Sequence, residues 1–287
     1  MSGSRAKGDR KRARAAMEQQ VATSRAEAER VSRLACSSFG RKLTWAERHI
    51  DSVEASLTAW RSNGYRSFEE TDSHGITTIY AQTVRPLSED VPLLVGDAAQ
   101  SLLNSLDHLA FAIAGANTPN GLTETQERQS QFPIQRRCPR NDQGVITPGI
   151  GTTTWPSCAQ AVVSVMQPYL GKEGLNTHPL WLLHDLANRD KHRLLTVATF
   201  GHSINEMTMG NGYIDYFQAF EAREIGTEPV PLLAFSRRNY GDMRLRASFD
   251  IRFADGPLVA GREVVGTLRM LADYIRTVPV ARLAKFL

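Results

Sequence analysis

Cysteine is scarce in this sequence, and its scarcity limits the kinds of site that the chain can build. The three cysteines, Cys36, Cys138 and Cys158, are odd in number and widely spaced, and no C-x-x-C pair occurs. A disulfide framework needs paired cysteines, and a zinc finger needs ligands at short spacing. The sequence therefore predicts neither, and it favours reduced thiols in a cytoplasmic protein.

Long apolar runs and an evenly spread basic charge are also missing. No segment approaches eighteen consecutive apolar residues, so we expect no membrane-spanning helix. Residues 1–14 hold six basic side chains and one acid, whereas the whole chain has a formal net charge of only +4. The rest of the chain is therefore nearly neutral. We expect a disordered basic tail over residues 1–14 that can attract phosphates, and not a basic duplex-binding fold.

Familiar catalytic signatures are absent as well. The sequence contains no G-x-S-x-G, H-E-x-x-H, EF-hand or G-x-G-x-x-G pattern. Gly149 to Gly151 are not followed by the lysine of a phosphate-binding loop, so we interpret them as plain loop. These patterns predict no cofactor and no metal ion.

Apolar periodicity is what the sequence does offer, and it predicts an α+β protein. Helices are expected over residues 15–36, 44–63, 91–115, 157–169, 178–195 and 262–277. A β-hairpin is expected over 65–72 and 76–84, and a three- or four-stranded antiparallel sheet over 196–209, 213–224, 230–236 and 243–253. Residues 116–158 look like a long irregular insertion, which Phe132-Pro133-Ile134 anchors to the core. We predict one domain over residues 15–287: mainly a helical bundle, with the hairpin, the C-terminal sheet and a closing helix.

Two of the expected helices carry a polar stripe beside their apolar one. The first stripe is Asp97, Ser101, Asn104 and His108, with Asp107 adjacent; the second is His184, Asn188 and His192, with Lys191 adjacent. A buried polar stripe is costly unless its groups are paired. The sequence therefore predicts that the stripes face each other or one cleft, with six neighbouring side chains: Asn104, Asp107, His108, His184, Asn188 and His192.

This predicted cluster is compatible with three kinds of role. His192, His184, Asn188, Asp107 and His108 are candidate catalytic residues, because imidazoles act as general acids or bases and carboxylates orient them. Lys191, Arg193 and Arg189 are candidates for binding the phosphates of a nucleic acid. His108, His184, His192 and Asp107 also have the ligand types of a metal-dependent hydrolase. The simplest interpretation is a polar network that only fixes the register of two helices.

Several segments resemble a group of bacterial and phage proteins of unassigned function. The segments are GDAAQSLLNSLDHLA (96–110), FPI (132–134), QPY (167–169), LWLLHDLANRDKHR (180–193) and FDIRFADGPL (249–258). The two helical segments also resemble, more distantly, the HEPN superfamily, which implies a helical bundle that is frequently dimeric, often a defence ribonuclease. The catalytic signature of that superfamily is an arginine, four to six residues and a histidine. Only two residues separate Arg189 from His192, so the ribonuclease residues are not carried over.

These observations lead to one expected function and two alternatives. We expect a binding or interaction protein of a phage- or defence-associated family. The alternatives are a HEPN-like RNA-acting nuclease or RNA-binding protein, and a metal-dependent hydrolase. The expected partners are a second copy of the chain, another protein, or RNA bound through the basic tail or the polar cluster.

Overall fold

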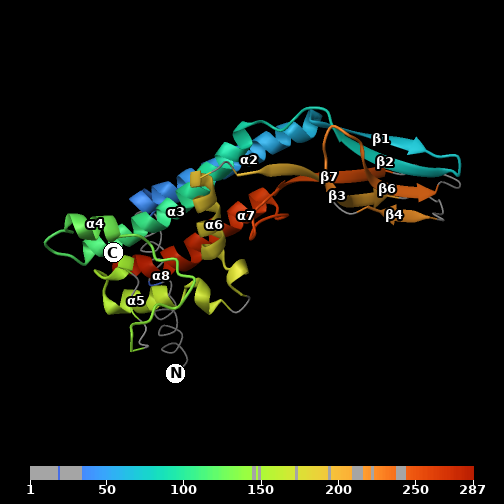
Figure 1. The fold of residues 1–287 in the computed structure, drawn as a ribbon. Coiled ribbons are helices and arrows are strands. Elements are labelled where there is room, and N and C mark those ends of the chain that lie inside the picture. Colours follow the sequence, from blue (N-terminus) through green and yellow to red (C-terminus); the bar gives the residue numbers. More distant parts are fainter. Residues whose placement is uncertain are drawn as a thin grey trace, which may run out of the picture.

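The computed structural model describes residues 19, 34–143, 147, 150–171, 174–192, 195–208, 216–220, 223–236 and 244–287. Helices and antiparallel strands are both present, so the predicted α+β class is confirmed. The helices gather at one end of an elongated molecule and most of the strands extend from the other (Figure 1). The tail over residues 1–14 and most of the helix expected over 15–36 lie outside the described residues. Within the described residues, no helix is both long enough and apolar enough to cross a membrane.

Helix α2 (Ser38–Asn63) begins earlier than the sequence predicts. We expected a start at Thr44 from its spacing to Glu47, but the Ser37 side chain caps the helix by accepting a hydrogen bond from Gly40 N. This earlier cap is favoured because Phe39 and Leu43 extend the apolar face, with 2% and 7% of their surface exposed. The predicted buried face is confirmed: Ala46, Ile50, Val53, Leu57 and Trp60.

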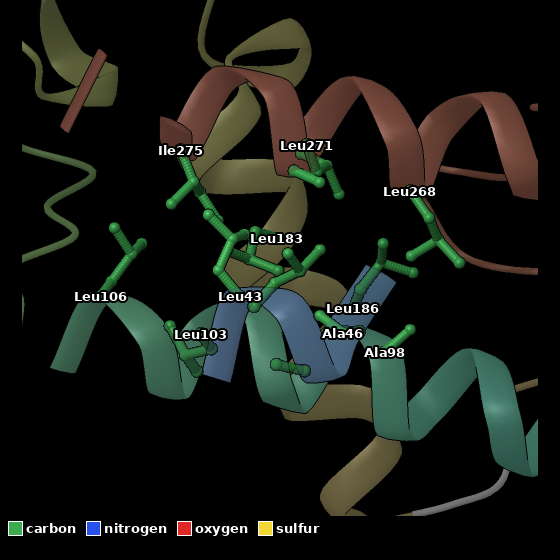
Figure 2. Close-up of a cluster of buried hydrophobic side chains, with 14 of the residues drawn as sticks. Leu43, Ala46, Ala98, Leu103, Leu106, Leu183, Leu186, Leu268, Leu271 and Ile275 are labelled. Atoms are coloured by element: carbon green, nitrogen blue, oxygen red, sulfur yellow. The ribbon is translucent and has the colours of Figure 1, made fainter. Parts of the chain in front are cut away.

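Three further helices enclose the main core with α2. Helix α3 (Asp90–Ala116) packs along α2, and α6 (Pro179–His192) and α7 (Val264–Ile275) pack against this pair. Figure 2 shows apolar side chains from all four helices pointing toward one another: Leu43, Ala46, Ala98, Leu103, Leu106, Leu183, Leu186, Leu268, Leu271 and Ile275. The apolar faces predicted for α3 and α7 are therefore buried as expected.

The chain beyond α7 closes the end of the bundle. A π-helical turn (Arg276–Val280) leads into α8 (Ala281–Leu283) and a 3₁₀ turn (Ala284–Phe286). Asn117 Nδ2, just after α3, donates a hydrogen bond of 3.1 Å to the carbonyl of Phe286. This contact ties the last residues of the chain to the C-terminal end of α3.

The insertion is more regular than its sequence suggests. It contains a short helix α4 (Glu124–Gln129), started by a capping box between Thr123 and Gln126. We missed this helix because it buries no residue and so has no apolar periodicity. A 3₁₀ turn (Ile150–Thr152) precedes α5 (Ser157–Ser164), which ends before the predicted residue 169. Two 3₁₀ turns, Pro168–Leu170 and Leu175–Thr177, then lead to α6.

The predicted β-hairpin is confirmed. Strands β1 (Tyr65–Thr71) and β2 (Ile76–Thr83) pair antiparallel, with Phe68 opposite Tyr80. The turn is held by Asp72 Oδ1, which accepts hydrogen bonds of 2.9 Å from the backbone N–H groups of His74 and Ile76. Gly75 has φ +77°, a value that glycine adopts without the steric cost of a side chain.

The predicted C-terminal antiparallel strands are present, but they divide between two sheets. The later strands are β3 (Val197–Thr208), β4 (Phe217–Ala219), β5 (Arg223–Glu224), β6 (Val230–Ser236) and β7 (Arg244–Phe253). Two of them extend the hairpin into a sheet of order β1-β2-β6-β4, and the other three form a second sheet of order β5-β3-β7. Leu233 and Phe235 of β6 are buried opposite β2, and no local pattern in the sequence specifies this distant pairing.

Candidate functional site

The two polar stripes lie on helices that pack together, but the hydrogen bonds of Asn188 and Asn104 stay within their own helices. On α6, Asn188 Nδ2 lies 3.1 and 3.0 Å from the two ring nitrogens of His184. On α3, Asn104 Oδ1 accepts a hydrogen bond of 3.1 Å from Gln100 Nε2. The side chain of His192 and the whole of Arg193 lie outside the described residues, so their predicted place in the cluster stays a prediction.

Asp107 binds a backbone group of the insertion. Its Oδ1 accepts a hydrogen bond of 2.9 Å from Phe132 N. Burial raises the pKa of this carboxyl group, while the Phe132 N–H and the nearby charges of Lys191 and His108 oppose the rise. Asp107 therefore holds the chain at Phe132, a partner that the stripe pattern did not predict.

The segment from Phe132 to Cys138, which we call the strap, is held at several further points. Phe132 is a core residue with 5% of its surface exposed. The Gln167 side chain, 1% exposed, accepts a hydrogen bond of 2.9 Å from Gln135 N and donates one of 2.8 Å to the Pro133 carbonyl. Such buried side chain-to-backbone bonds fix a loop that has no regular structure of its own.

The far end of the strap is held by Tyr169. Its hydroxyl is hydrogen-bonded to Cys138 and donates to the Ser164 carbonyl at 3.3 Å. Burial is the main cause that raises the pKa of Tyr169, and the bond to Cys138 adds to it. The strap is thus held by α3 at its start and by the segment after α5 over the remainder.

The strap places an arginine over a row of planar side chains on α6. The guanidinium of Arg136 lies 5.9 Å from the ring centroid of Trp181. The Trp181 and His184 rings stack, with centroids 5.0 Å apart and an interplanar angle of 13°. Asn188 Nδ2 lies at nearly the same distance from Nδ1 and Nε2 of His184. If Nδ2 lay in the plane of the ring at these distances, it would clash with Cε1, the ring carbon between the two nitrogens. The amide therefore lies over the ring face, and Trp181, His184 and Asn188 form a column along α6.

The charge on this surface is positive. Arg136, Arg137 and Lys191 are exposed, and in the part of the chain that the structure describes none of them forms an ion pair with an acidic side chain. Burial, together with the charge of Lys191, lowers the pKa of His184, while Asp185 opposes this, so the imidazole is neutral near pH 7. Arg189, a predicted phosphate-binding residue, instead pairs with Asp185 at 3.0 Å and is mostly buried.

The end of α6 lies close to two glycines. A Cβ atom added to Gly96 would lie 1.9 Å from Asp190 Oδ1, so the absence of a side chain lets α6 approach α3. Burial and the neighbouring Asp97 raise the pKa of Asp190. A Cβ atom on Gly256 would lie 3.6 Å from Arg189 Cζ, which places the turn after β7 against the same part of α6.

All the segments that carried the family resemblance therefore meet around α6. Asp107 binds Phe132, Gln167 and Tyr169 hold the strap, Arg136 covers Trp181, and Gly96 contacts Asp190. The sequence pattern does not bring Gln167, Arg136 and Trp181 together. The signal was present, because each of these residues lies in or next to a quoted segment, but the spacing between segments does not show which of them touch.

No group of three or more His, Cys, Asp or Glu side chains is placed to bind a metal ion within the described residues. His192, one of the four predicted ligands, is not among the side chains described there. Comparisons of the chain with protein-family models, with curated proteins and with solved structures find no match. The resemblances noted in the sequence, including the HEPN-like bundle, accordingly remain expectations.

Proposed function

We propose that this protein works by binding single-stranded RNA without cleaving it, and that the binding surface is the strap face. We define the strap face as Arg136, Arg137, Trp181, His184 and Lys191. The observation that carries the proposal is the Arg136–Trp181–His184 stack, held in place by a strap that Asp107 and Gln167 fix.

The surroundings of the polar groups favour binding over acid–base catalysis. A general base needs a lone pair directed at the substrate. Asp107 Oδ1 accepts the backbone N–H of Phe132, so this oxygen is used to position the strap. Trp181 and Asn188 occupy the faces of the His184 ring, so the ring is used in the column, and the nuclease assay below tests the lone pairs that remain in its plane.

The chemistry of the surface favours RNA among the expected partners. Proteins that bind single strands combine cations for the phosphates with planar side chains for the bases. Arg136, Arg137 and Lys191 supply the positive charge. The Trp181 and His184 rings stack on each other, so the planar group that a base can reach is the exposed guanidinium of Arg136, which lies over Trp181. An unpaired strand fits better than a duplex, because only unpaired bases can stack on side chains.

The test is fluorescence anisotropy with a labelled single-stranded RNA, with the full chain, at several salt concentrations. Arg136→Gln and Lys191→Gln should each weaken binding severalfold and lower the salt dependence by about one phosphate contact. The control is Arg128→Gln on α4, where an exposed arginine pairs with Glu124. The basic residues 1–14 contribute equally in all variants. Failure of the wild type to bind, or equal weakening by Arg128→Gln, would refute the proposal.

The nuclease alternative is tested with the same RNA on a denaturing gel. We expect the RNA to be recovered intact after incubation with the wild type. Cleavage that His184→Ala removes, with the fold retained, would instead assign catalysis to the cluster.

A further inference from the structure

Strand β1 lies at the edge of its sheet. In the order β1-β2-β6-β4, its partner among the described strands is β2. Figure 1 shows β1 on the outer side of the strands, which extend past the end of the long helices. An edge of this length can pair with another strand unless its sequence prevents it.

The backbone pattern shows which residues of β1 face outward. Asp72 N donates to the Ile76 carbonyl and Val84 N donates to the Gly64 carbonyl, so even-numbered positions of β1 bond to β2. In an antiparallel ladder the bonding direction alternates along the strand. The backbone groups of odd-numbered positions, Ser67 and Thr71 among them, therefore point away from β2.

Three side chains of β1 form a short symmetric row on one face of the sheet. They are Arg66, Phe68 and Glu70, and each is two residues from the next. Phe68 stacks on Tyr80 of β2, with ring centroids 5.6 Å apart and an interplanar angle of 19°. The row thus has a positive end, an aromatic centre and a negative end.

Charged side chains on an edge strand normally prevent unwanted pairing. That explanation suits a strand whose charges repel every approaching copy. Here the two charges are opposite in sign and lie two residues on either side of Phe68. The Arg66 guanidinium donates hydrogen bonds of 2.9 and 2.7 Å to Gln82 Oε1 of β2 and lies 5.4 Å from the Phe68 ring centroid, so it is held beside the ring. An antiparallel second copy would therefore meet attraction at both ends of the row.

We propose that two copies of this chain pair through β1, antiparallel and centred on Phe68. In this register Arg66 lies opposite the partner's Glu70, and Glu70 lies opposite the partner's Arg66. Odd positions face odd positions, so the outward backbone groups can bond across the interface. Phe68 and the partner's Phe68 occupy a non-hydrogen-bonded pair, in which side chains lie closest, and continue the aromatic row that Tyr80 begins.

Sedimentation equilibrium of the full chain tests the charge pairing. Arg66→Glu alone, or Glu70→Arg alone, replaces two attractive contacts with two repulsive ones and should weaken the dimer about tenfold or more. An equimolar mixture of the two variants restores both contacts, so it should form a mixed dimer within about threefold of the wild-type affinity. The proposal is overturned if either single variant dimerises like the wild type, or if the mixture stays monomeric. It is also overturned if the wild type is monomeric up to about millimolar concentration.

A backbone variant tests the pairing independently of charge. Ser67→Pro removes an outward N–H and leaves the β1–β2 bonds intact, so the fold should survive while the dimer is lost. Circular dichroism melting checks the fold of each variant. A Ser67→Pro protein that is folded and still dimeric would show that the contact lies elsewhere.

Discussion

The helices and the sheets of this protein are held together to very different extents. The four packed helices share one core, in which Leu102, Leu106, Leu109 and Ile113 are fully buried. The four-stranded sheet has a small separate cluster around Trp60, Ala81 and Ile225 at its base, and Phe217 in β4 is 47% exposed. Stability should therefore be concentrated in the helices, while the sheet offers surface and edges.

The largest expected effect comes from opening a cavity among the helices. Leu106→Ala should lower the free energy of unfolding by about 2–5 kcal/mol, because a fully buried leucine leaves a void. Phe217→Ala in the sheet should change it by less than about 0.5 kcal/mol, since the ring is already half exposed. Urea denaturation measures both changes. Equal effects would show that Phe217 is packed as firmly as Leu106, against the difference that we infer.

A smaller effect tests the close approach of α6 to α3. Gly96→Ala should destabilise the fold by about 1–3 kcal/mol, because the new Cβ atom meets the Asp190 carboxylate. Gly115→Ala is the matched control in the same helix, where a Cβ atom would meet nothing within 4 Å. The control should stabilise the protein by about 0.5–1 kcal/mol through helix propensity. If Gly96→Ala stabilised the protein as much, Asp190 would not need that space.

The smallest expected effect is a dependence of stability on pH. His178 caps α6 by accepting a hydrogen bond of 3.3 Å from Leu180 N, and burial lowers its pKa. His178 therefore binds a proton more readily in the unfolded chain than in the folded one. Its contribution to the free energy of unfolding is fully present above the pKa of an unfolded histidine, near 6.5, and is lost as the pH falls below that value. His184 contributes in the same direction. Asp107 and Asp190, whose pKa values are raised, act in the opposite direction at lower pH.

The measurement is urea denaturation at several pH values between 7.5 and 5.5, comparing the wild type with His178→Asn. Asparagine is a good N-cap that does not titrate, so the variant should lose less stability over this range. An identical loss in both proteins would exclude His178 as a source of the pH dependence.

The sequence predicts the two regions unequally well. The helices at 91–115, 178–195 and 262–277 were predicted because each repeats an apolar face every three or four residues. The start of α2 was missed, since Ser37 competed with Thr44 as a cap, and α4 was missed because it buries nothing. The division of the strands was missed because the pairing of β2 with β6 joins segments about 150 residues apart.

The candidate site shows the same limit. Periodicity placed Asp107 and His184 on polar stripes, and both side chains are engaged. It could not reveal that Asp107 binds Phe132 N, or that Gln167 binds the strap, because both contacts depend on how a loop folds back on helices. Stacking of Arg136 on Trp181 depends in turn on those contacts.

The position of β1 has one further consequence. The strap face lies among the helices, whereas β1 lies on the strands that extend from their far end (Figure 1). In a dimer formed by antiparallel pairing of two β1 edges, the two strap faces would lie at opposite ends. A long RNA could then engage both and gain avidity, whereas a short one could engage only one. Apparent affinity would consequently rise with the length of the RNA beyond the span of a single site.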